Sequence, residues 1–135
     1  MNKRFYLGFI AVAIYVVVFE GVLHGGLLKG LYQATATVWR PEEAMESFFL
    51  WMLMGQLLFA FMFCLIFTFT RCQTTLKQGA TYGLAMGFLM SSISLIYYSV
   101  LPIPMALLVW WLVGGIVETI IAGALFACIY TRDSD

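Results

Sequence analysis

Four long apolar stretches, separated by short polar segments, make up most of the chain. They cover about residues 5–28, 48–70, 79–101 and 105–130. About 20 mostly apolar residues are enough for an α-helix to cross the roughly 30 Å hydrocarbon core of a bilayer. Because backbone groups in lipid must be bonded within the segment, each stretch predicts a helix. We therefore expect an all-α polytopic membrane protein, with four transmembrane helices in an antiparallel bundle that forms a single domain over residues 1–135.

The composition favours the same class of protein. Hydrophobic residues make up 63% of the 135 residues and charged residues only 10%, and the mean hydropathy is +0.95. Soluble domains contain about 45–50% apolar and about 25% charged residues. Seven basic and seven acidic residues balance, and the sequence has no cluster of basic residues of the kind that binds nucleic acid. We expect membrane lipids, and no nucleic acid, as partners of this chain.

The distribution of Lys and Arg predicts the orientation in the membrane. Five of these residues fall on one side of the predicted spans, namely Lys3, Arg4, Arg71, Lys77 and Arg132. Only Lys29 and Arg40 fall on the other side. Since cytoplasmic loops carry the excess of Lys and Arg, we expect both termini in the cytoplasm. The turn "LPIPM", where Pro102 and Pro104 stop the helix, then lies on the outer side.

Ionisable and amide side chains interrupt the apolar spans at few positions. Glu20 and His24 lie one helical turn apart near the outer end of the first span, and Gln56 lies about two turns inside the second. Four hydroxyl-bearing residues of the third span are expected at the same level, namely Ser92, Ser94, Tyr97 and Tyr98. Glu118 lies deeper, in the fourth span. A charged group within a bilayer is costly. The candidate ligand or proton-path residues are therefore Glu20, His24, Gln56 and Glu118.

Several roles are open for these residues. They fit a hydrogen-bonded clasp between helices, or a site for a lipid, quinone, pigment or metal. His24 is a candidate metal ligand, but a chain with one histidine needs a second subunit or an external ligand to complete a transition-metal site. A third role is a proton or solute path through Glu20 and Glu118. The helical rise separates these two by roughly 10 Å in depth, with Tyr15 and Tyr82 as expected neighbours of Glu118.

Catalysis is not indicated by the sequence. It contains no catalytic-triad signature, no HExxH zinc motif and no glycine-rich phosphate loop. No cofactor is identified. We expect a non-enzymatic protein.

Small residues at four-residue spacing form a ridge on each of the last two spans. The third span carries Gly79, Gly83, Gly87 and Ser91, and the fourth carries Gly115, Thr119, Gly123 and Ala127. Small residues let membrane helices approach closely, because lipid supplies no hydrophobic drive for their association. These ridges predict helix packing between the two spans. The alternative is that one of the ridges contacts another protein.

Aromatic and charged residues mark the predicted outer interface. The residues placed to anchor it are Trp39, Arg40, Trp51, Trp110 and Trp111. In "WRPEEAMESFFLW", Pro41 suits the first position of a helix, and Glu42 and Glu43 suit its first turn. The stretch therefore predicts an interfacial anchor and the start of a helix. A recognition site for a partner on the outer side is the alternative.

The strings "LHGGLLKGLYQ" and "WRPEEAM", and the Pro-x-Pro before a Trp-containing fourth span, resemble those of uncharacterised small four-span bacterial membrane proteins. The resemblance implies four helices in a bacterial cytoplasmic membrane and implies no chemistry. Because little of the chain lies outside the spans, we expect an accessory or structural subunit of a larger membrane complex, partnered by other subunits or by itself. The alternatives are a small proton-coupled transporter or channel working as a homo-oligomer, and a binder of a lipid, quinone, pigment or metal.

Overall fold

The computed structural model describes residues 2–70 and 75–130, and its elements within these ranges are all helical. In chain order they are α1 (Lys3–Val22), η1 (Leu23–Leu27), α2 (Lys29–Ala34), η2 (Ala36–Val38), α3 (Glu42–Met45), η3 (Glu46–Phe48), α4 (Phe49–Phe69), α5 (Leu76–Val100) and α6 (Met105–Ile129). Within the described residues, four helices are long and apolar enough to cross a membrane. The α1–η1 helix, α4, α5 and α6 begin and end within three residues of the predicted spans. Arg71 and Arg132, used above to predict orientation, lie outside the described residues.

Local signals in the sequence set the helix ends. The Asn2 side chain accepts a hydrogen bond from the backbone N–H of Phe5 at 3.0 Å and so caps α1. Thr75 caps α5 in the same way, by accepting from the N–H of Gln78 at 3.3 Å. Pro104 is the N-cap residue of α6 and keeps the backbone extended between α5 and α6. Between η1 and α4, the predicted outer segment folds into the short helices α2, η2, α3 and η3.

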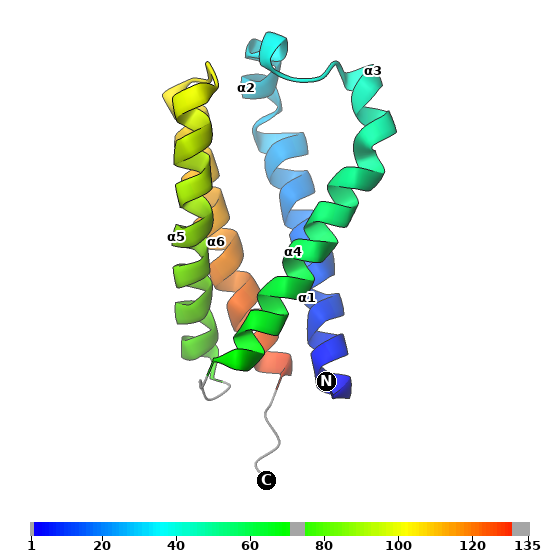
Figure 1. The fold of residues 1–135 in the computed structure, drawn as a ribbon, viewed down its shortest axis with the longest axis vertical. Helices are drawn as coiled ribbons and strands as arrows, with labels where there is room; N and C mark the ends of the chain where they lie inside the picture. Colours follow the sequence, from blue (N-terminus) through cyan, green and yellow to red (C-terminus); the bar gives the residue numbers. More distant parts are fainter. Residues whose placement is uncertain (1, 71–74, 131–135) are drawn as a thin grey trace.

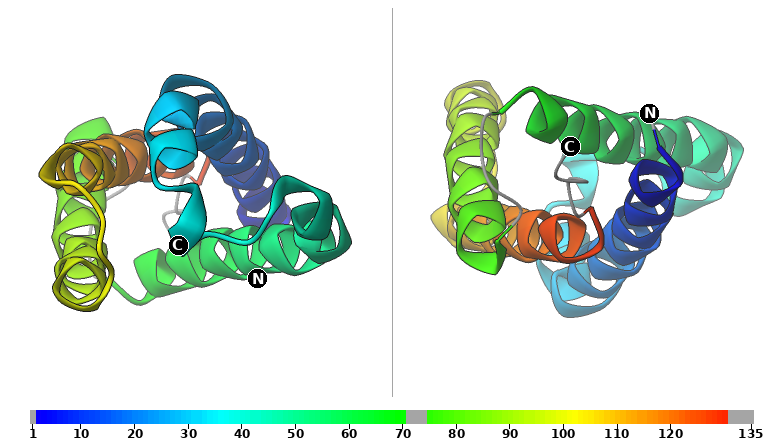
Figure 2. Two further views of the ribbon diagram at one scale, coloured as in Figure 1. Left: turned by 90° about the horizontal axis from the view of Figure 1, so that it is seen from above. Right: turned by 90° about the horizontal axis from the view of Figure 1, so that it is seen from below.

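Figure 1 shows how the long helices are arranged. The first residues of α1 and the last residues of α6 lie at one end of the molecule, here called the lower end, and α2, α3 and the α5–α6 turn lie at the upper end. α5 and α6 form the most extensive helix pair, and α1 packs against both α6 and α4. The views along the long axis show that α4 is strongly inclined (Figure 2). Its lower end lies near the base of α5, and its upper end leans away from α5.

The small-residue ridges bring the backbones of α5 and α6 together in their lower part. A Cβ atom at Gly79 would overlap the carbonyl oxygen of Gly123, and one at Gly83 would overlap that of Thr119. At Gly87, an added Cβ would lie 2.5 Å from the Thr119 hydroxyl oxygen. No side chain larger than hydrogen fits at these glycines without moving α6. This is the close helix contact that small residues permit.

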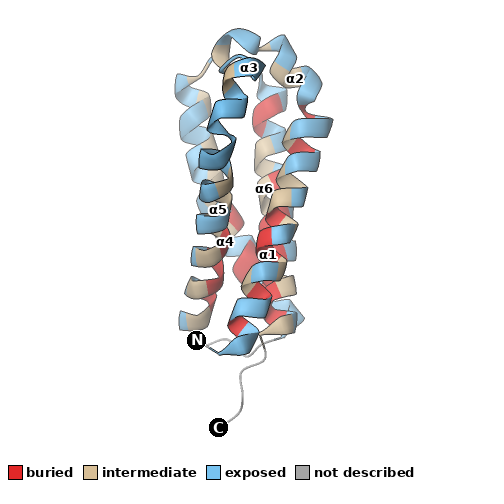
Figure 3. Cartoon of the chain, turned by 90° about the vertical axis from the view of Figure 1, so that its right-hand side faces the viewer, coloured by how far each residue is buried: buried red, intermediate tan, exposed pale blue. Residues whose placement is uncertain are grey.

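The buried side chains form two separate clusters. The lower core draws on all four long helices and consists of Phe5, Val12, Ala13, Val16, Ala60, Phe63, Cys64, Phe67, Tyr82, Ala122, Phe126 and Ala127. The upper core is smaller and consists of Leu23, Leu28, Ile103 and Leu107. Figure 3 shows the buried residues along α6 and the parts of the other helices that face it, whereas the upper part of α4 is exposed. Along the first helix, Glu20 lies between Val16 of the lower core and Leu23 of the upper core.

Candidate functional site

His24 lies on a turn where the first helix departs from α-helical geometry. Residues Leu23–Leu27 form a π-helical turn, in which the N–H of Leu28 donates to the carbonyl of Leu23 at 2.9 Å. A Cβ atom added at Gly25 or Gly26 would meet no neighbouring atom. These glycines therefore do not admit a second helix, and they leave the turn open around His24. Single π-helical turns within α-helices occur frequently at functional sites.

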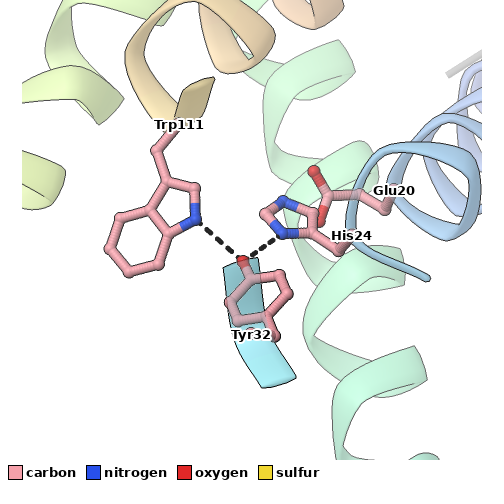
Figure 4. Close-up of polar contacts among 4 residues, drawn as sticks. All are labelled: Glu20, His24, Tyr32 and Trp111. Carbon is pink, nitrogen blue, oxygen red and sulfur yellow. Dashed lines mark hydrogen bonds and ion pairs between the residues drawn. The ribbon is translucent and has the colours of Figure 1, made fainter. Parts of the chain in front are cut away.

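A chain of polar contacts runs from Glu20 to Trp111 (Figure 4). His24 Nε2 lies 3.4 Å from Glu20 Oε2, and His24 Nδ1 lies 2.5 Å from the Tyr32 hydroxyl oxygen. Trp111 Nε1 donates to the same hydroxyl oxygen at 2.8 Å. Because an indole N–H can only donate, the Tyr32 hydroxyl keeps its own proton for His24 Nδ1. This direction leaves the other imidazole nitrogen to donate to Glu20. Each of the four side chains in this series of contacts therefore has a partner.

Tyr32 joins this chain from α2, which folds back over the upper end of α1. Its ring lies edge-to-face against Trp39 at 5.3 Å between centroids, and Trp39 lies 6.1 Å from Trp111 in the same way. The Trp39 indole donates to the Thr35 hydroxyl at 2.9 Å. Burial raises the pKa of the Tyr32 phenol; the Trp111 hydrogen bond opposes this rise and the Glu20 carboxylate adds to it. The hydroxyl is therefore held in its neutral, hydrogen-donating form.

Glu118 is buried in the interior on α6, with 6% of its surface exposed. Its carboxyl group interacts electrostatically with that of Glu20 on α1 and with the Tyr15 hydroxyl. Glu118 Oε1 and Tyr15 Oη are buried without a hydrogen-bond partner among the described residues. Tyr82, the other expected neighbour, instead donates to the backbone carbonyl of Phe63 at 2.6 Å. The predicted separation of roughly 10 Å in depth came from the helical rise alone, and the two carboxyl groups are near enough to interact electrostatically.

A cavity of about 290 Å³ opens beside Glu20 and His24. It is lined by Glu20, Leu23, His24, Gly87, Met90, Ser91, Ser94, Tyr97, Trp111 and Gly115. Gly115 and Ser91 belong to the predicted packing ridges, yet a Cβ atom at Gly115 would meet nothing within 4 Å. At this level the ridges therefore border the cavity, and Gly114 takes the helix contact, against Leu23 of the first span.

The structure brings together some of the expected residues and not others. Ser94 and Tyr97 of the third span line the cavity, as their predicted depth suggests. Ser92 donates to the carbonyl of Leu89 in its own helix at 2.6 Å. Tyr98 packs against the upper core. Gln56 is not among the cavity residues, because α4 leans away at this height.

The five expected interface residues divide into two groups. Trp51 and Trp110 are exposed on the outside of the bundle, and the guanidinium of Arg40 lies 3.8 Å from the ring centre of Phe48. Trp39 and Trp111 face inward, into the cluster around Tyr32. Tyr32 itself was not expected from the sequence, since it lies in the polar segment between two spans.

The described part of the chain holds no group of three or more His, Cys, Asp or Glu that could bind a metal ion. Both ring nitrogens of His24 are also engaged, one by Glu20 and one by Tyr32. A metal at His24 would have to displace one of these partners. Comparisons with protein-family models, with curated proteins and with solved structures find no match for this chain. The chemistry of the site therefore has to be argued from its own residues.

Proposed function

We propose that the protein is a non-enzymatic, proton-coupled carrier of the bacterial cytoplasmic membrane. In this proposal its four long helices cross the membrane in antiparallel order, with both termini in the cytoplasm and α2 on the outer side. It works as a homo-oligomer, because four helices enclose little volume. Of the roles expected from the sequence, a carrier accounts best for ionisable groups that border a cavity.

One observation carries the proposal: a cavity lies beside a series of ionisable and hydroxyl groups that interact from α6 through α1 to α2. Glu118 interacts with Glu20, Glu20 pairs with His24, and His24 is hydrogen-bonded to Tyr32. Carboxyl, imidazole and phenol groups in contact can pass a proton along the series, as in the relays of pumps and transporters. A clasp between helices does not require the cavity, and it does not require a second carboxyl group with an unpartnered oxygen.

The two carboxyl groups supply the coupling. Glu20 and Glu118 interact electrostatically within the predicted spans, and a second negative charge there is strongly disfavoured. The pair is therefore suited to hold or release one proton. Glu20 also lines the cavity, so a solute bound there acts on the same carboxyl group that holds the proton. Solute binding and proton binding are linked through Glu20.

The proposal is tested with the full chain reconstituted into lipid vesicles that enclose a pH-sensitive dye. Vesicles carrying a pH gradient are exposed in turn to cationic, anionic and neutral amphiphilic solutes. At least one class should collapse the gradient faster than in protein-free vesicles. Glu20→Gln and Glu118→Gln should abolish this flux, and Glu43→Gln, which removes an exposed carboxylate outside the site, should not. If no class of solute moves protons, or if both site variants retain the flux, the carrier function is refuted.

A second candidate function, an accessory subunit of a larger membrane complex, is favoured by the upper part of α4. Leu50, Trp51 and Leu58 are 65%, 69% and 63% exposed, where α4 leans away from the other helices. Another membrane protein, or a second copy of this chain, would bury this surface. Gentle solubilisation of the native membrane followed by a mass measurement tests the idea. A lone 15.2 kDa chain would contradict it.

A further inference from the structure

The charges inside the spans do not balance. The predicted spans, residues 5–28, 48–70, 79–101 and 105–130, contain no Lys and no Arg. Their only acidic residues are Glu20 and Glu118, and their only histidine is His24. Two carboxyl groups thus share the spans with one imidazole, and even a protonated imidazole would neutralise only one of them. Since an unneutralised charge at this depth is costly, the remaining carboxyl group requires a proton or a bound cation.

The walls of the cavity decide which kind of cation fits. Beside Glu20 the cavity is lined by the aromatic residues Trp111 and Tyr97 and by the apolar residues Leu23 and Met90. Aromatic faces attract cations, and Trp attracts them best. Organic ammonium groups combine positive charge with an apolar surface, so they match both features. The hydroxyls of Ser91 and Ser94 add hydrogen-bond acceptors for an ammonium that carries protons.

A metal cation fits the cavity less well. Hard cations such as Mg²⁺ and Ca²⁺ take about six to eight oxygen ligands, and one side of this cavity is aromatic and apolar. The volume of about 290 Å³ is also far larger than one water molecule, which takes about 30 Å³ in the liquid. The cavity has room for a compact organic group.

We infer that the cavity binds an organic ammonium group on a compact apolar body, with Glu20 as its counter-ion and the rings of Trp111 and Tyr97 as its walls. This inference rests on the proposed carrier function and names its class of substrate. Two sources supply such a group: a free amphiphilic amine and the ammonium headgroup of a membrane lipid.

Binding exchanges one cation for one proton. The ammonium enters beside Glu20, and the proton held by the Glu20–Glu118 pair leaves, so the charge of the site is conserved. The titratable groups that face Glu20 are His24 from its own helix, Glu118 from α6 and Tyr32 from α2. α5 contributes the hydroxyls of Ser91, Ser94 and Tyr97 to the cavity. Of these groups, Glu118 is the one that shares the proton with Glu20.

The test is equilibrium dialysis of labelled benzyltrimethylammonium against the purified full chain in detergent, with protein-free micelles as the blank. Unlabelled benzyltrimethylammonium should displace the label. Neopentylbenzene, which has the same shape without the charge, and benzenesulfonate, an anion, should not. Glu20→Gln should weaken binding by at least about tenfold, equivalent to about 1.4 kcal/mol, and Glu43→Gln should leave it unchanged.

A second variant keeps the test decisive if Glu20→Gln does not fold. Gly115→Leu places a side chain in the cavity at a position where a Cβ atom meets no neighbour. It should fold with its carboxyl groups intact and lose binding. If neopentylbenzene competes as well as the cation, or if Gly115→Leu and Glu20→Gln bind as the native chain does, the ammonium site is refuted.

Two further experiments are needed. The first distinguishes a lipid headgroup from a free amine as the ligand, and the second distinguishes failure of the ammonium site from failure of the carrier function. Binding that is strong in phosphatidylglycerol nanodiscs and weak in phosphatidylethanolamine nanodiscs supports a lipid headgroup as the occupant, and equal binding supports a free amine. In the vesicle assay, coupled flux with anionic or neutral solutes alone refutes the ammonium class and leaves the carrier function standing. Ammonium binding without proton release refutes the carrier function and leaves the ammonium class standing.

Discussion

The lower and upper parts of the α5–α6 pair use the same four-residue spacing of small residues with opposite results. In the lower part, Gly79 and Gly83 lie directly against the backbone of α6. In the upper part, Ser91 and Gly115 border a cavity. The difference lies in the surrounding residues, because the large residues Tyr97 and Trp111 line the cavity together with Ser91 and Gly115. A ridge of small residues therefore allows close helix contact but does not ensure it. The neighbouring side chains decide whether the space is filled by a helix or left for a ligand.

The largest expected effect comes from placing one side chain at matched positions in the two parts. Gly83→Leu forces a side chain into the carbonyl of Thr119 and should destabilise the fold by about 3 kcal/mol or more, since the obstacle is backbone. Gly115→Leu extends into the cavity and should change stability by no more than about 0.5 kcal/mol. Thermal unfolding of the purified variants in one detergent measures both. Equal losses for the two variants would show that the upper part is packed as closely as the lower part.

Replacing Glu118 sharpens the comparison between the two parts of the molecule. It separates the effect of the buried carboxyl group on stability from its effect on proton flux. Glu118→Met removes a buried carboxyl group whose Oε1 has no hydrogen-bond partner among the described residues. Burying a carboxyl group without a hydrogen bond is costly, and an apolar side chain of similar size does not carry that cost. We expect a higher unfolding temperature and no proton flux. A destabilised Glu118→Met protein would indicate that Glu118 is part of a structural clasp, and Glu118→Gln serves as the control of the same shape.

The lower core contains a polar group with the opposite expected behaviour. Tyr82 donates to the carbonyl of Phe63 at 2.6 Å in a buried setting. Tyr82→Phe should destabilise the protein by about 1 kcal/mol, the usual net value of such a hydrogen bond, and should leave proton flux unchanged. Thermal unfolding and the vesicle assay give the two readouts. Loss of flux in Tyr82→Phe would extend the functional region into the lower core.

The extent of the helices could be predicted from the sequence, but their inclination could not. Apolar length and the prolines at positions 102 and 104 placed all four long helices within three residues of their bounds. Hydrophobic length permits a helix to tilt without fixing the angle, which depends on packing against neighbours. The tilt of α4 separates its upper part from α5, and Gln56 does not line the cavity beside Glu20. Glu20 on α1 and Glu118 on α6 interact electrostatically.

The candidate site was predicted in part for a related reason. Glu20, His24 and Glu118 stood out because an ionisable residue among apolar ones is itself a signal. Tyr32 lies in a polar segment, where a tyrosine is unremarkable, and its role depends on the return of α2 over the first helix. Trp111 matched the pattern of an interface anchor, because aromatic residues are enriched there whichever way they face. The glycines at 25 and 26 indicated a weak point in the helix, but the π-helical turn is a matter of hydrogen-bond register that composition does not specify.

The smallest expected effect concerns the Tyr32 hydroxyl. It tests whether the side chains packed around Tyr32 exclude solvent from this hydroxyl. Burial raises the pKa of this phenol above its ordinary value near 10, so the folded protein retains a proton that the unfolded chain releases. Stability should therefore fall as the pH rises above about 10, toward the folded pKa. Tyr32→Phe has no proton to lose at this position, so its unfolding temperature should decline less steeply with pH than that of the native chain. Parallel declines would mean that Tyr32 is as open to water as an exposed tyrosine, and the series from Glu118 to Tyr32 would then end at His24.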